Sequence, residues 1–591
     1  MKLIFDLESD GLLPELTKIH CIVAKDTETN QVYSFKPNEV EKGLDLLADA
    51  KEIIAHNGIG FDIPAIKKVY PQWFTNAKIT DTLVLSRLIF PDLKNKDFAV
   101  SNKHGFDNRL IGSHSLEAWG RRLNILKGNF GKQTDWQQWT QEMQNYCNQD
   151  VEVTHTFYKE LQKRKYSPAA IELEHQFAQC IFLQETLGFQ FNNEEALQLL
   201  RKLTKKRLEL EEKLQEVFPP VQKDLGEFIP ARDNKTLGYV KGVAIHKYET
   251  VNFNPNSRHH IADRLKDKYN WKPKAFTPDG KPVVDEGVLN KLEYEEAKIL
   301  SEYLLIQKRI SQLAEGSSAW LKLSKGDRIH GHVNTLGTIT GRCTHNRPNI
   351  AQVPSVGVPY GYECRSLFTV PYGYKLVGVD VSGLELRCLS HYLARFDGGE
   401  YVRQVTEGDV HTFNQQAANL PNRNLAKRVI YGLIYGIGDA RMGELVGGST
   451  AEGKKIKKLL FSKIPALPKL TNAIKRKLET SKYIKALDGR LLHCRSAHSA
   501  LNFLIQSCGS ILVKKATTLL HEQLFARYEY PKDFAMVAHI HDEMQLQVRE
   551  DIAHDVGRLA VEAVKKAGES FELRCPLDAE YKIGNNWAET H

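Results

Sequence analysis

The order of strand-rich and helix-rich segments constrains the fold of this chain most. Short apolar strand patterns alternate with helical patterns in residues 1–165, a mainly helical stretch follows to about residue 330, and strands return from Gly331. Alternating strands and helices are typical of an α/β domain. A chain of 591 residues is too long for one hydrophobic core. We therefore expect a multidomain protein that combines α/β and α+β domains.

The helical stretch in the middle predicts an arm built from two long helices. The first is expected over 193–217, because leucines recur on one face, Asn192 and Glu195 form a capping-box pattern, and Pro219–Pro220 follow. The second is expected from about Leu292 to Leu323, with an irregular tip at about 222–251 between them. The leucines of the expected stripe are Leu200, Leu203, Leu210 and Leu214.

Two acidic segments that lie far apart along the chain end predicted strands. Asp380 ends the apolar strand that starts at Lys375, and Asp542–Glu543 lie between the two predicted strands of a hairpin over 535–550. Either acid alone is most often a turn or helix cap. Together they can hold a pair of Mg²⁺ ions, which clamp the attacking and leaving oxygens of a phosphoryl transfer.

A predicted helix between these acids carries Arg423, Lys427, Tyr431 and Tyr435 at intervals of four residues. Residues four apart lie near one face of a helix. Arg and Lys can neutralise a triphosphate, and an aromatic ring can support a base and sugar. The alternative is a solvated basic face, but such faces rarely continue into Tyr and Gly.

A second acidic set lies at the front of the chain. Asp6 and Glu8 are two apart on a predicted strand, and Tyr146 and Asp150 are four apart on a predicted helix, so each pair shares one face. Asp62 lies between them along the chain. Any single one of these acids is most often an ordinary surface residue.

Composition limits the class of protein only loosely. A net charge of +9 suits a polyanionic partner, and the nine cysteines are scattered without metal-site spacing, as expected for reduced thiols. Asp6 and Glu8 interrupt the N-terminal apolar stretch, so we expect no signal peptide, and no apolar run has membrane-spanning length.

Three motifs resemble motifs A, B and C of family A DNA polymerases, namely DVSGLELR, RNLAKRVIYGLIYG and HDE. The segments TGRCTHNRPNIAQVP and FELRCPLDAEYKIGNNWAETH resemble the replicative polymerases of short-tailed bacteriophages. The four acids and the tyrosine at the front of the chain resemble the metal-binding Asp-Glu-Asp-Asp set of proofreading 3′–5′ exonucleases, in the variant that also has a tyrosine. The resemblance implies an RNase H-like exonuclease domain followed by a right-hand polymerase. Its expected parts are the exonuclease at 1–165, linker and thumb at 166–330, palm at 331–410, fingers at 411–480 and the rest of the palm at 481–591.

The resemblance also implies residue roles in DNA synthesis. Asp380, Asp542 and the carbonyl of Val381 would hold two Mg²⁺ ions, with Glu543 as a neighbour. Glu385 would crowd the sugar 2′ carbon and exclude ribonucleotides. The expected contacts of the incoming nucleotide are Arg423, Lys427 and His411 on the triphosphate and Tyr431 and Tyr435 at the base. The expected contacts of the DNA duplex are Arg342, Asn502, Gln506 and His541.

For the exonuclease, the resemblance implies that the four front carboxylates hold two Mg²⁺ or Mn²⁺ ions and that Tyr146 orients the attacking water. They are Asp6, Glu8, Asp62 and Asp150. No member of the set is replaced, so we expect an active exonuclease.

The implied partners are primer-template DNA and dNTPs, with a phage helicase-primase and a single-strand-binding protein, in the cytoplasm of an infected bacterial host. Thioredoxin is not expected, because the thumb tip is short. Its cations could contact DNA phosphates directly, and they are Lys223, Arg232, Lys235, Lys241 and Lys247. Two alternatives are a single-subunit RNA polymerase, which shares the motifs, and a non-catalytic DNA-binding module. Glu385 and the front exonuclease argue against the first, and the two intact acidic sets argue against the second.

Overall fold

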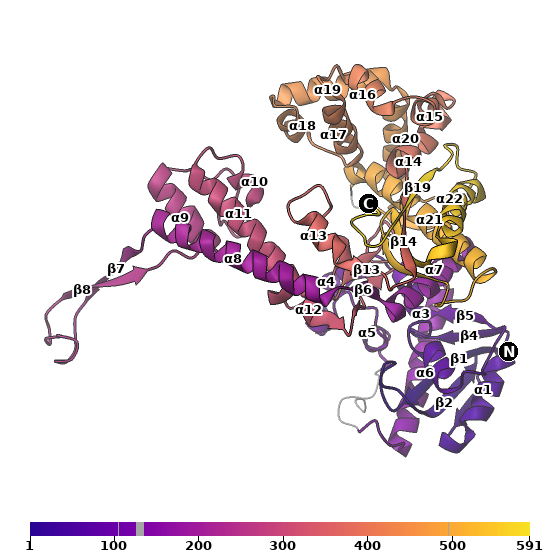
Figure 1. Cartoon of the computed structure of the whole chain (residues 1–591). Coiled ribbons are helices and arrows are strands. Elements are labelled where there is room, and N and C mark those ends of the chain that lie inside the picture. The colour runs from indigo at the N-terminus through magenta and orange to yellow at the C-terminus, as the bar shows by residue number, and fades with distance from the viewer. Residues whose placement is uncertain (105, 126–134, 495) are drawn as a thin grey trace. The chain divides into compact units, whose positions relative to one another are not determined.

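The computed structural model describes residues 1–104, 106–125, 135–494 and 496–591, and the chain forms two compact units (Figure 1). The first unit contains Met1–Phe189, His330–Gln352 and Thr369–His591, and the second contains Gln190–Ile329 and Val353–Phe368. This grouping differs from the expected ranges in two places. Helix α7 (Pro168–Leu187) belongs to the first unit because it packs against α21 (Ala497–Phe525) and β17 (Phe534–Ile540). Residues 353–368, which we expected in the palm, belong to the second unit.

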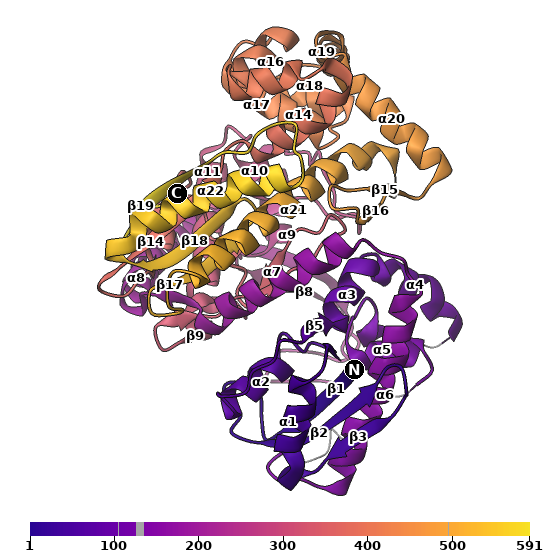
Figure 2. The same cartoon turned by 90° about the vertical axis from the view of Figure 1, so that its right-hand side faces the viewer.

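The N-terminal part of the first unit is a five-stranded sheet in the order β3-β2-β1-β4-β5 (Figure 2). Side chains of β1 alternate between its faces, so that Leu3 and Phe5 pack in one core while Ile4 packs in another beneath α6. The strands are β1 (Lys2–Ser9), β2 (Ile19–Asp26), β3 (Val32–Phe35), β4 (Glu52–Ala55) and β5 (Lys78–Asp81). The helices are α1 (Val40–Ala48), α2 (Asp62–Val69), α3 (Thr82–Ile89), α4 (Leu93–His104), α5 (Leu116–Arg122) and α6 (Gln141–Gln162).

Two helices are separated by a break near residue 166, where the expected first domain ends, although both belong to the first unit. Helix α6 ends at Gln162, and α7 begins at Pro168 with the Ser167 side chain accepting a hydrogen bond from the Ala170 backbone N–H. Proline suits the first helical position because it has no backbone N–H, and an N–H at that position would have no intrahelical partner.

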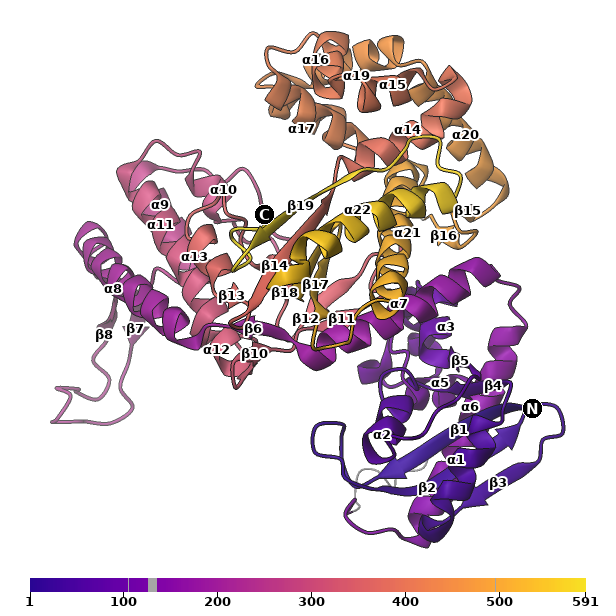
Figure 3. The same ribbon diagram turned by 45° about the vertical axis from the view of Figure 1, so that its right-hand side comes forward.

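The C-terminal part of the first unit contains an antiparallel sheet in the order β17-β18-β14-β19 (Figure 3). Strand β14 (Tyr374–Val381) lies between β18 (Glu543–Arg549) and β19 (Ala579–Gly584). The predicted hairpin is confirmed, since β17 and β18 are joined by the two-residue turn His541–Asp542. His541 has a φ of 56°, the left-handed conformation that such tight turns require.

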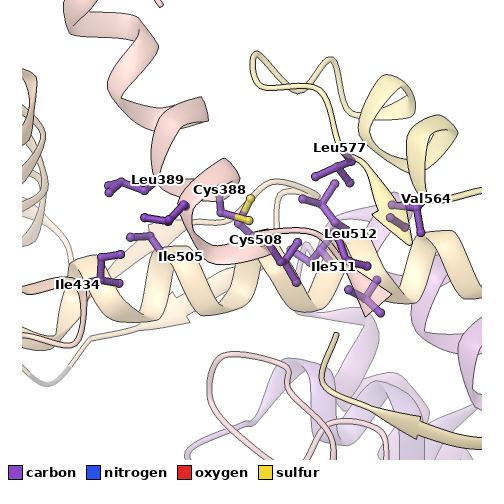
Figure 4. Packing of buried hydrophobic residues seen from close by; sticks show 14 of the residues in the cluster. Cys388, Leu389, Ile434, Ile505, Cys508, Ile511, Leu512, Val564 and Leu577 are labelled. Carbon is purple, nitrogen blue, oxygen red and sulfur yellow. The ribbon is translucent and has the colours of Figure 1, made fainter. Parts of the chain in front are cut away.

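Helices surround this sheet and form one large core with it. Helix α21 carries Ile505, Cys508, Ile511 and Leu512 into that core, where Cys388 and Leu389 of α14 also lie (Figure 4). The segment 411–480 is helical as expected. The helices of this part are α14 (Leu384–Asp397), α15 (Glu400–Thr406), α16 (Val410–Ala418), α17 (Arg423–Ile434), α18 (Asp439–Leu445), α19 (Thr450–Lys463), α20 (Ala466–Thr480) and α22 (Ala553–Ser570).

The second unit contains the predicted first long helix, α8 (Asn193–Val217), capped by the Asn192 side chain. The expected stripe of buried leucines on this helix is wrong at one position, because Leu199 is buried and Leu200 is not. The predicted continuous helix to Leu323 is wrong. Helix α11 (Glu295–Ile310) passes into a π-helical turn and stops before Gly316, and a separate short α12 (Trp320–Leu323) follows.

The expected irregular tip is a two-stranded antiparallel ribbon, β7 (Val221–Phe228) with β8 (Ile245–Val251) (Figure 1). Both strands are mostly exposed on both faces, so they lack the apolar alternation by which a strand is recognised in sequence. The other elements of the second unit or its borders are α9 (Arg258–Tyr269), α10 (Glu286–Leu289), α13 (Gly361–Ser366), β6 (Phe189–Phe191), β9 (Ser324–Lys325), β10 (Arg328–Ile329) and β13 (Phe368–Thr369).

Short strands complete the first unit, namely β11 (His332–Asn334), β12 (Thr344–Asn346), β15 (Tyr483–Lys485) and β16 (Leu491–His493). Throughout the described part of the chain, no helix combines the length and apolar character that crossing a bilayer requires. All nine cysteines are free thiols.

Candidate active sites

Neighbouring strands bring the two distant acidic segments together. Asp380 ends β14, and the Asp542 carbonyl in the β17–β18 turn accepts a hydrogen bond from the Val381 backbone N–H at 3.1 Å. Asp380 also lies directly opposite Glu543 on one side and Glu580 on the other. A row of like charges across three strands is unfavourable by itself. The repulsion between these carboxylates costs free energy unless bound cations or hydrogen bonds offset it.

The pKa values of both aspartates are raised, mainly by burial and further by the charges of neighbouring carboxylates. Burial, together with the charges of Asp542 and Glu543, raises the pKa of Asp380 to about 6. Burial also raises the pKa of Asp542, and the charge of Glu543 adds to this effect. A divalent cation between these oxygens would offset both costs. Carboxylate oxygens are also the ligands that Mg²⁺ prefers, so the residues fit such an ion.

Glu543 differs from the two aspartates because its carboxylate is held by the C-terminal segment. It accepts hydrogen bonds from Trp587 Nε1 at 2.5 Å and from Gln545 Nε2 at 2.7 Å, and it lies 3.4 Å from His591 Nδ1. These bonds agree with the expectation that Glu543 is a neighbour of the metal ligands.

Helix α17 presents the expected basic and aromatic face. Arg423 and Lys427 are exposed, and Tyr431 is partly buried near His411, whose ring centre lies 6.4 Å from that of Tyr431. Arg423 forms an ion pair with Asp409 at 2.8 Å. The sequence analysis missed Asp409, which also caps α16 and so fixes the position of His411. Its signal was available, since an Asp just before a helix is a common N-cap.

Three side chains that we expected to act separately are joined by hydrogen bonds. The Tyr435 hydroxyl donates to both carboxylate oxygens of Glu385, at 2.6 and 2.8 Å, and Arg342 Nη2 donates to one of them at 2.9 Å. Tyr435 lies just past the end of α17, which stops at Ile434. Burial raises the pKa of Tyr431 to about 12, and the charges of Glu385 and Asp542 contribute. Glu385 is therefore held between Arg342 and Tyr435, the residue that follows the helix carrying the cations.

The other expected duplex contacts come from α21 and from the hairpin turn. Asn502 and Gln506 are four apart on α21, and Gln506 Oε1 lies 3.5 Å from the Thr340 hydroxyl. The Asn502 side-chain oxygen is buried without a hydrogen-bond partner in the described residues. His541 keeps contact with solvent, and the partial desolvation of its ring together with the charge of Arg342 lowers its pKa.

Asp6 and Glu8 lie on the face of the N-terminal sheet that α6 covers, the face on which Ile4 also lies. Asp6 and Glu8 project from β1, the central strand, with Asp6 half-buried and Glu8 buried. Asp150 is buried on α6, and Tyr146 is half-buried one turn earlier. Asp62 is buried at the start of α2. The loop before it is held by Asp81, whose carboxylate accepts hydrogen bonds from the Asn57 and Ile59 backbone N–H groups.

Among the described residues, one group of three possible metal ligands has its ligand atoms within 4.8 Å of one another. It consists of Asp6, Glu8 and Cys147. Asp62 and Asp150 are not members of this close group. The sequence analysis missed Cys147, because a lone cysteine between Tyr146 and Asn148 shows no ligand pattern. The donor set of Asp6 and Glu8 fits a divalent cation.

Comparisons with known proteins agree with this arrangement. Residues 235–589 match the model of DNA polymerase family A, and residues 3–162 match that of the RNase H superfamily. The chain is 35% identical to the DNA-directed DNA polymerases of Enterobacteria phage T3 and of Escherichia phage T7, over 100% of both chains in each case. Both alignments are 704 residues long, so these relatives carry segments that the 591 residues here do not match.

The fold is also similar to that of a solved structure, the POL domain of Pol1 from M. smegmatis in complex with DNA primer-template and dNTP. The TM-score is 0.75 at 16% identity, and the match covers 100% of this chain and 96% of that one. These comparisons do not favour the RNA polymerase or the non-catalytic alternative. The right-hand polymerase fold follows an RNase H-like domain, as expected, and the chain belongs to DNA polymerase family A.

Proposed function

We propose that this chain is a replicative DNA polymerase that adds dNTPs to a primer 3′ end and excises mispaired 3′ ends at a separate site. The observation that carries this proposal is the convergence of Asp380 and Asp542 on neighbouring strands, close enough to Tyr431 of α17 for the charge of Asp542 to act on that side chain. Family A polymerases and RNase H-like exonucleases generally depend on divalent metal ions.

In the polymerase site, Asp380, Asp542 and the Val381 carbonyl would hold two Mg²⁺ ions. When bound, the ions activate the primer 3′ oxygen and neutralise charge on the phosphates. Arg423 and Lys427 bind the triphosphate by charge. Both side chains are exposed and can reach an incoming nucleotide.

The remaining nucleotide contacts position the base and sugar. His411 binds the triphosphate from α16, and Tyr431 packs beneath the base and sugar. Tyr435 and Arg342 hold Glu385 in a fixed orientation through the hydrogen bonds described above. A fixed carboxylate near the sugar resists displacement by a ribonucleotide hydroxyl.

The DNA duplex would be contacted by Arg342, Asn502, Gln506 and His541. Donors that reach the minor-groove acceptors N3 and O2 test base-pair geometry without reading sequence, because every correct pair presents these acceptors. The Asn502 amide N–H groups are the donors that could reach N3 or O2, whereas its side-chain oxygen, which has no partner in the described residues, would accept from a donor of the ligand.

In the exonuclease site, Asp6, Glu8, Asp62 and Asp150 would hold two Mg²⁺ or Mn²⁺ ions. Tyr146 would orient the water that attacks the terminal phosphodiester. The position of Asp62 at the first residue of α2 agrees with this role, because a helix N-terminus favours negative charge and bound phosphate.

We further propose that the protein acts in the cytoplasm of an infected bacterial host, with a helicase-primase and a single-strand-binding protein as partners. DNA synthesis is expected without thioredoxin, since the thumb tip consists of the ribbon β7–β8 and the short segment 229–244 that joins its strands. Its cations would contact DNA phosphates, and a strong rise in processivity on adding thioredoxin would contradict this.

Primer extension tests the polymerase site. Asp380→Asn and Asp542→Asn should each lower nucleotide addition by about 10³-fold or more, because each removes a charge on which the metal ions depend. The matched control is Glu562→Gln, which neutralises an exposed acid on α22. Nucleotide addition that is undiminished in either aspartate variant refutes the assignment.

Excision of a mismatched primer end tests the exonuclease site. The double variant Asp6→Ala,Glu8→Ala should lose excision while primer extension continues at the parental rate. Glu28→Ala, at an exposed acid of the same domain, is the control. Equal excision by the double variant and the parent would overturn the site.

A further inference from the structure

A group of buried charges lies behind the loop that carries Arg342, and the proposed function does not use it. Arg490, just before β16, is buried. Its Nη2 lies 2.7 Å from Glu174 of α7 and 2.6 Å from Asp488 in the turn of the β15–β16 hairpin. Its Nε also donates to both carboxylate oxygens of Asp488, at 3.1 and 2.9 Å. Because these bonds come from two directions, they hold the plane of the guanidinium in one orientation.

The remaining nitrogen of this guanidinium, Nη1, faces Gly341. It has no hydrogen-bond partner in the described residues. It lies 2.5 Å from the position that a Cβ atom on residue 341 would occupy, which is closer than a real Cβ comes to a nonbonded atom. Gly341 also has a φ of 82°, in the left-handed region that favours glycine. The backbone at residue 341 therefore rests directly on a guanidinium that is itself held in place.

Hydrogen bonds fix the same loop from its other sides. The Ser510 hydroxyl of α21 donates to the Gly341 carbonyl at 2.9 Å. The Thr338 hydroxyl accepts from the Arg342 backbone N–H at 3.0 Å. From this loop the Arg342 side chain reaches Glu385 and donates to its carboxylate at 2.9 Å. The orientation of Glu385 therefore depends on a loop whose back is supported by the buried guanidinium.

We propose that Arg490 is a positioning residue for sugar selection. By supporting the backbone at Gly341, its guanidinium sets the direction of the Arg342 side chain. That side chain in turn holds the carboxylate of Glu385 where a ribonucleotide hydroxyl would meet it. Arg490 acts through the loop, since its guanidinium is buried and bonded to two carboxylates. The inference rests on the proposed role of Glu385 in excluding ribonucleotides.

Two substitutions at this contact test the proposal by mutual rescue. Arg490→Lys keeps a positive charge beside the two carboxylates but removes Nη1, and Gly341→Ala adds a methyl group close to the position of that nitrogen. The measurement is the ratio of kcat/KM for a ribonucleotide to kcat/KM for the matching dNTP in primer extension. Each substitution alone should raise this ratio by about fivefold, because each displaces the loop.

The double variant Gly341→Ala,Arg490→Lys gives the decisive comparison. The added methyl group occupies the space that Nη1 leaves, so the ratio should return toward the parental value. Two effects that simply multiply in the double variant overturn the proposal. A general loss of stability would lower the incorporation of both nucleotides together and leave the ratio at its parental value, so the ratio distinguishes positioning from a merely structural role.

A milder variant covers the case in which Arg490→Lys does not fold, as judged by Tm and by primer extension with dNTPs. Ser510→Ala removes the hydrogen bond to the Gly341 carbonyl and should raise the ratio by about threefold. Ser507→Ala is the matched control on the same helix, because the buried Ser507 hydroxyl has no partner in the described residues, and it should keep the parental ratio. A parental ratio in Ser510→Ala would show that the loop does not control Glu385, which overturns the proposal.

The Glu385→Ala background separates this proposal from the function on which it rests. Glu385→Ala alone should raise the ratio, and adding Arg490→Lys should then change it by less than about twofold, because the side chain that is positioned is gone. A further rise of about fivefold in that background would mean that Arg490 acts by another route, and it overturns the proposal. An unchanged ratio in Glu385→Ala instead overturns the role of Glu385 itself.

Discussion

The raised pKa of Asp380 predicts that metal affinity at the polymerase site falls steeply between pH 7 and pH 5. Only the ionised carboxylate binds a divalent cation. The pKa is about 6, so the ionised fraction falls from about nine-tenths at pH 7 to about one-tenth at pH 5. The sign follows from the direction of the shift: because the pKa of this acid is raised, protons compete with metal at a higher pH than they would at an ordinary aspartate.

The expected magnitude is a rise of about tenfold in the apparent Kd for Mn²⁺ from pH 7 to pH 5. The measurement is Mn²⁺ binding by electron paramagnetic resonance, made on Asp6→Ala,Glu8→Ala so that the exonuclease site does not contribute. Adding Glu580→Gln tests the cause, since Glu580 lies opposite Asp380 and raises its pKa. That change should move the pH midpoint downward.

The reasoning is refuted if the Kd changes by less than about twofold over this range, because an ordinary aspartate pKa near 4 would give almost no change there. A midpoint that Glu580→Gln leaves in place would show that Glu580 does not contribute, and that burial and the charges of Asp542 and Glu543 set the pKa.

Four more outcomes are expected. Glu385→Ala should raise ribonucleotide incorporation relative to dNTP incorporation in primer extension, and unchanged selectivity would exclude Glu385 as the discriminating residue. Tyr431→Phe should lower 2′,3′-dideoxynucleotide incorporation, because the hydroxyl can replace the missing 3′-OH contact; unaltered incorporation contradicts that role. Lys514→Met removes one of the two cations that bind the fully buried Glu174, the ammonium at 2.8 Å, and leaves Arg490 Nη2 at 2.7 Å as its partner, so it should destabilise the protein by about 1–3 kcal/mol in thermal denaturation; a change below about 0.5 kcal/mol would be inconsistent with this. Burial lowers the pKa of His539 to about 3, below its unfolded value, so stability should fall as pH drops below about 6.5, by about 1.4 kcal/mol per unit near pH 5; a His539→Leu variant with the same pH dependence of Tm as the parent would disprove this contribution.

Several elements could be predicted from local pattern because local physics determines them. The hairpin around His541–Asp542, the helix α8 and the break at Ser167–Pro168 all depend on apolar periodicity, capping and proline geometry within a few residues. The predicted helix to Leu323 failed because the sequence favours helix on both sides of Gly316 while the chain turns there.

The sequence by itself determined which residue types stand at each acidic and basic position, and the motif resemblance indicated the family to which the chain belongs. Tertiary structure alone decided their surroundings. The hydrogen bonds that join Tyr435 to Glu385 and the sulfur of Cys147 beside Asp6 connect residues 50 and 141 positions apart. Such contacts arise from packing between distant elements, and no periodicity within one segment carries information about them.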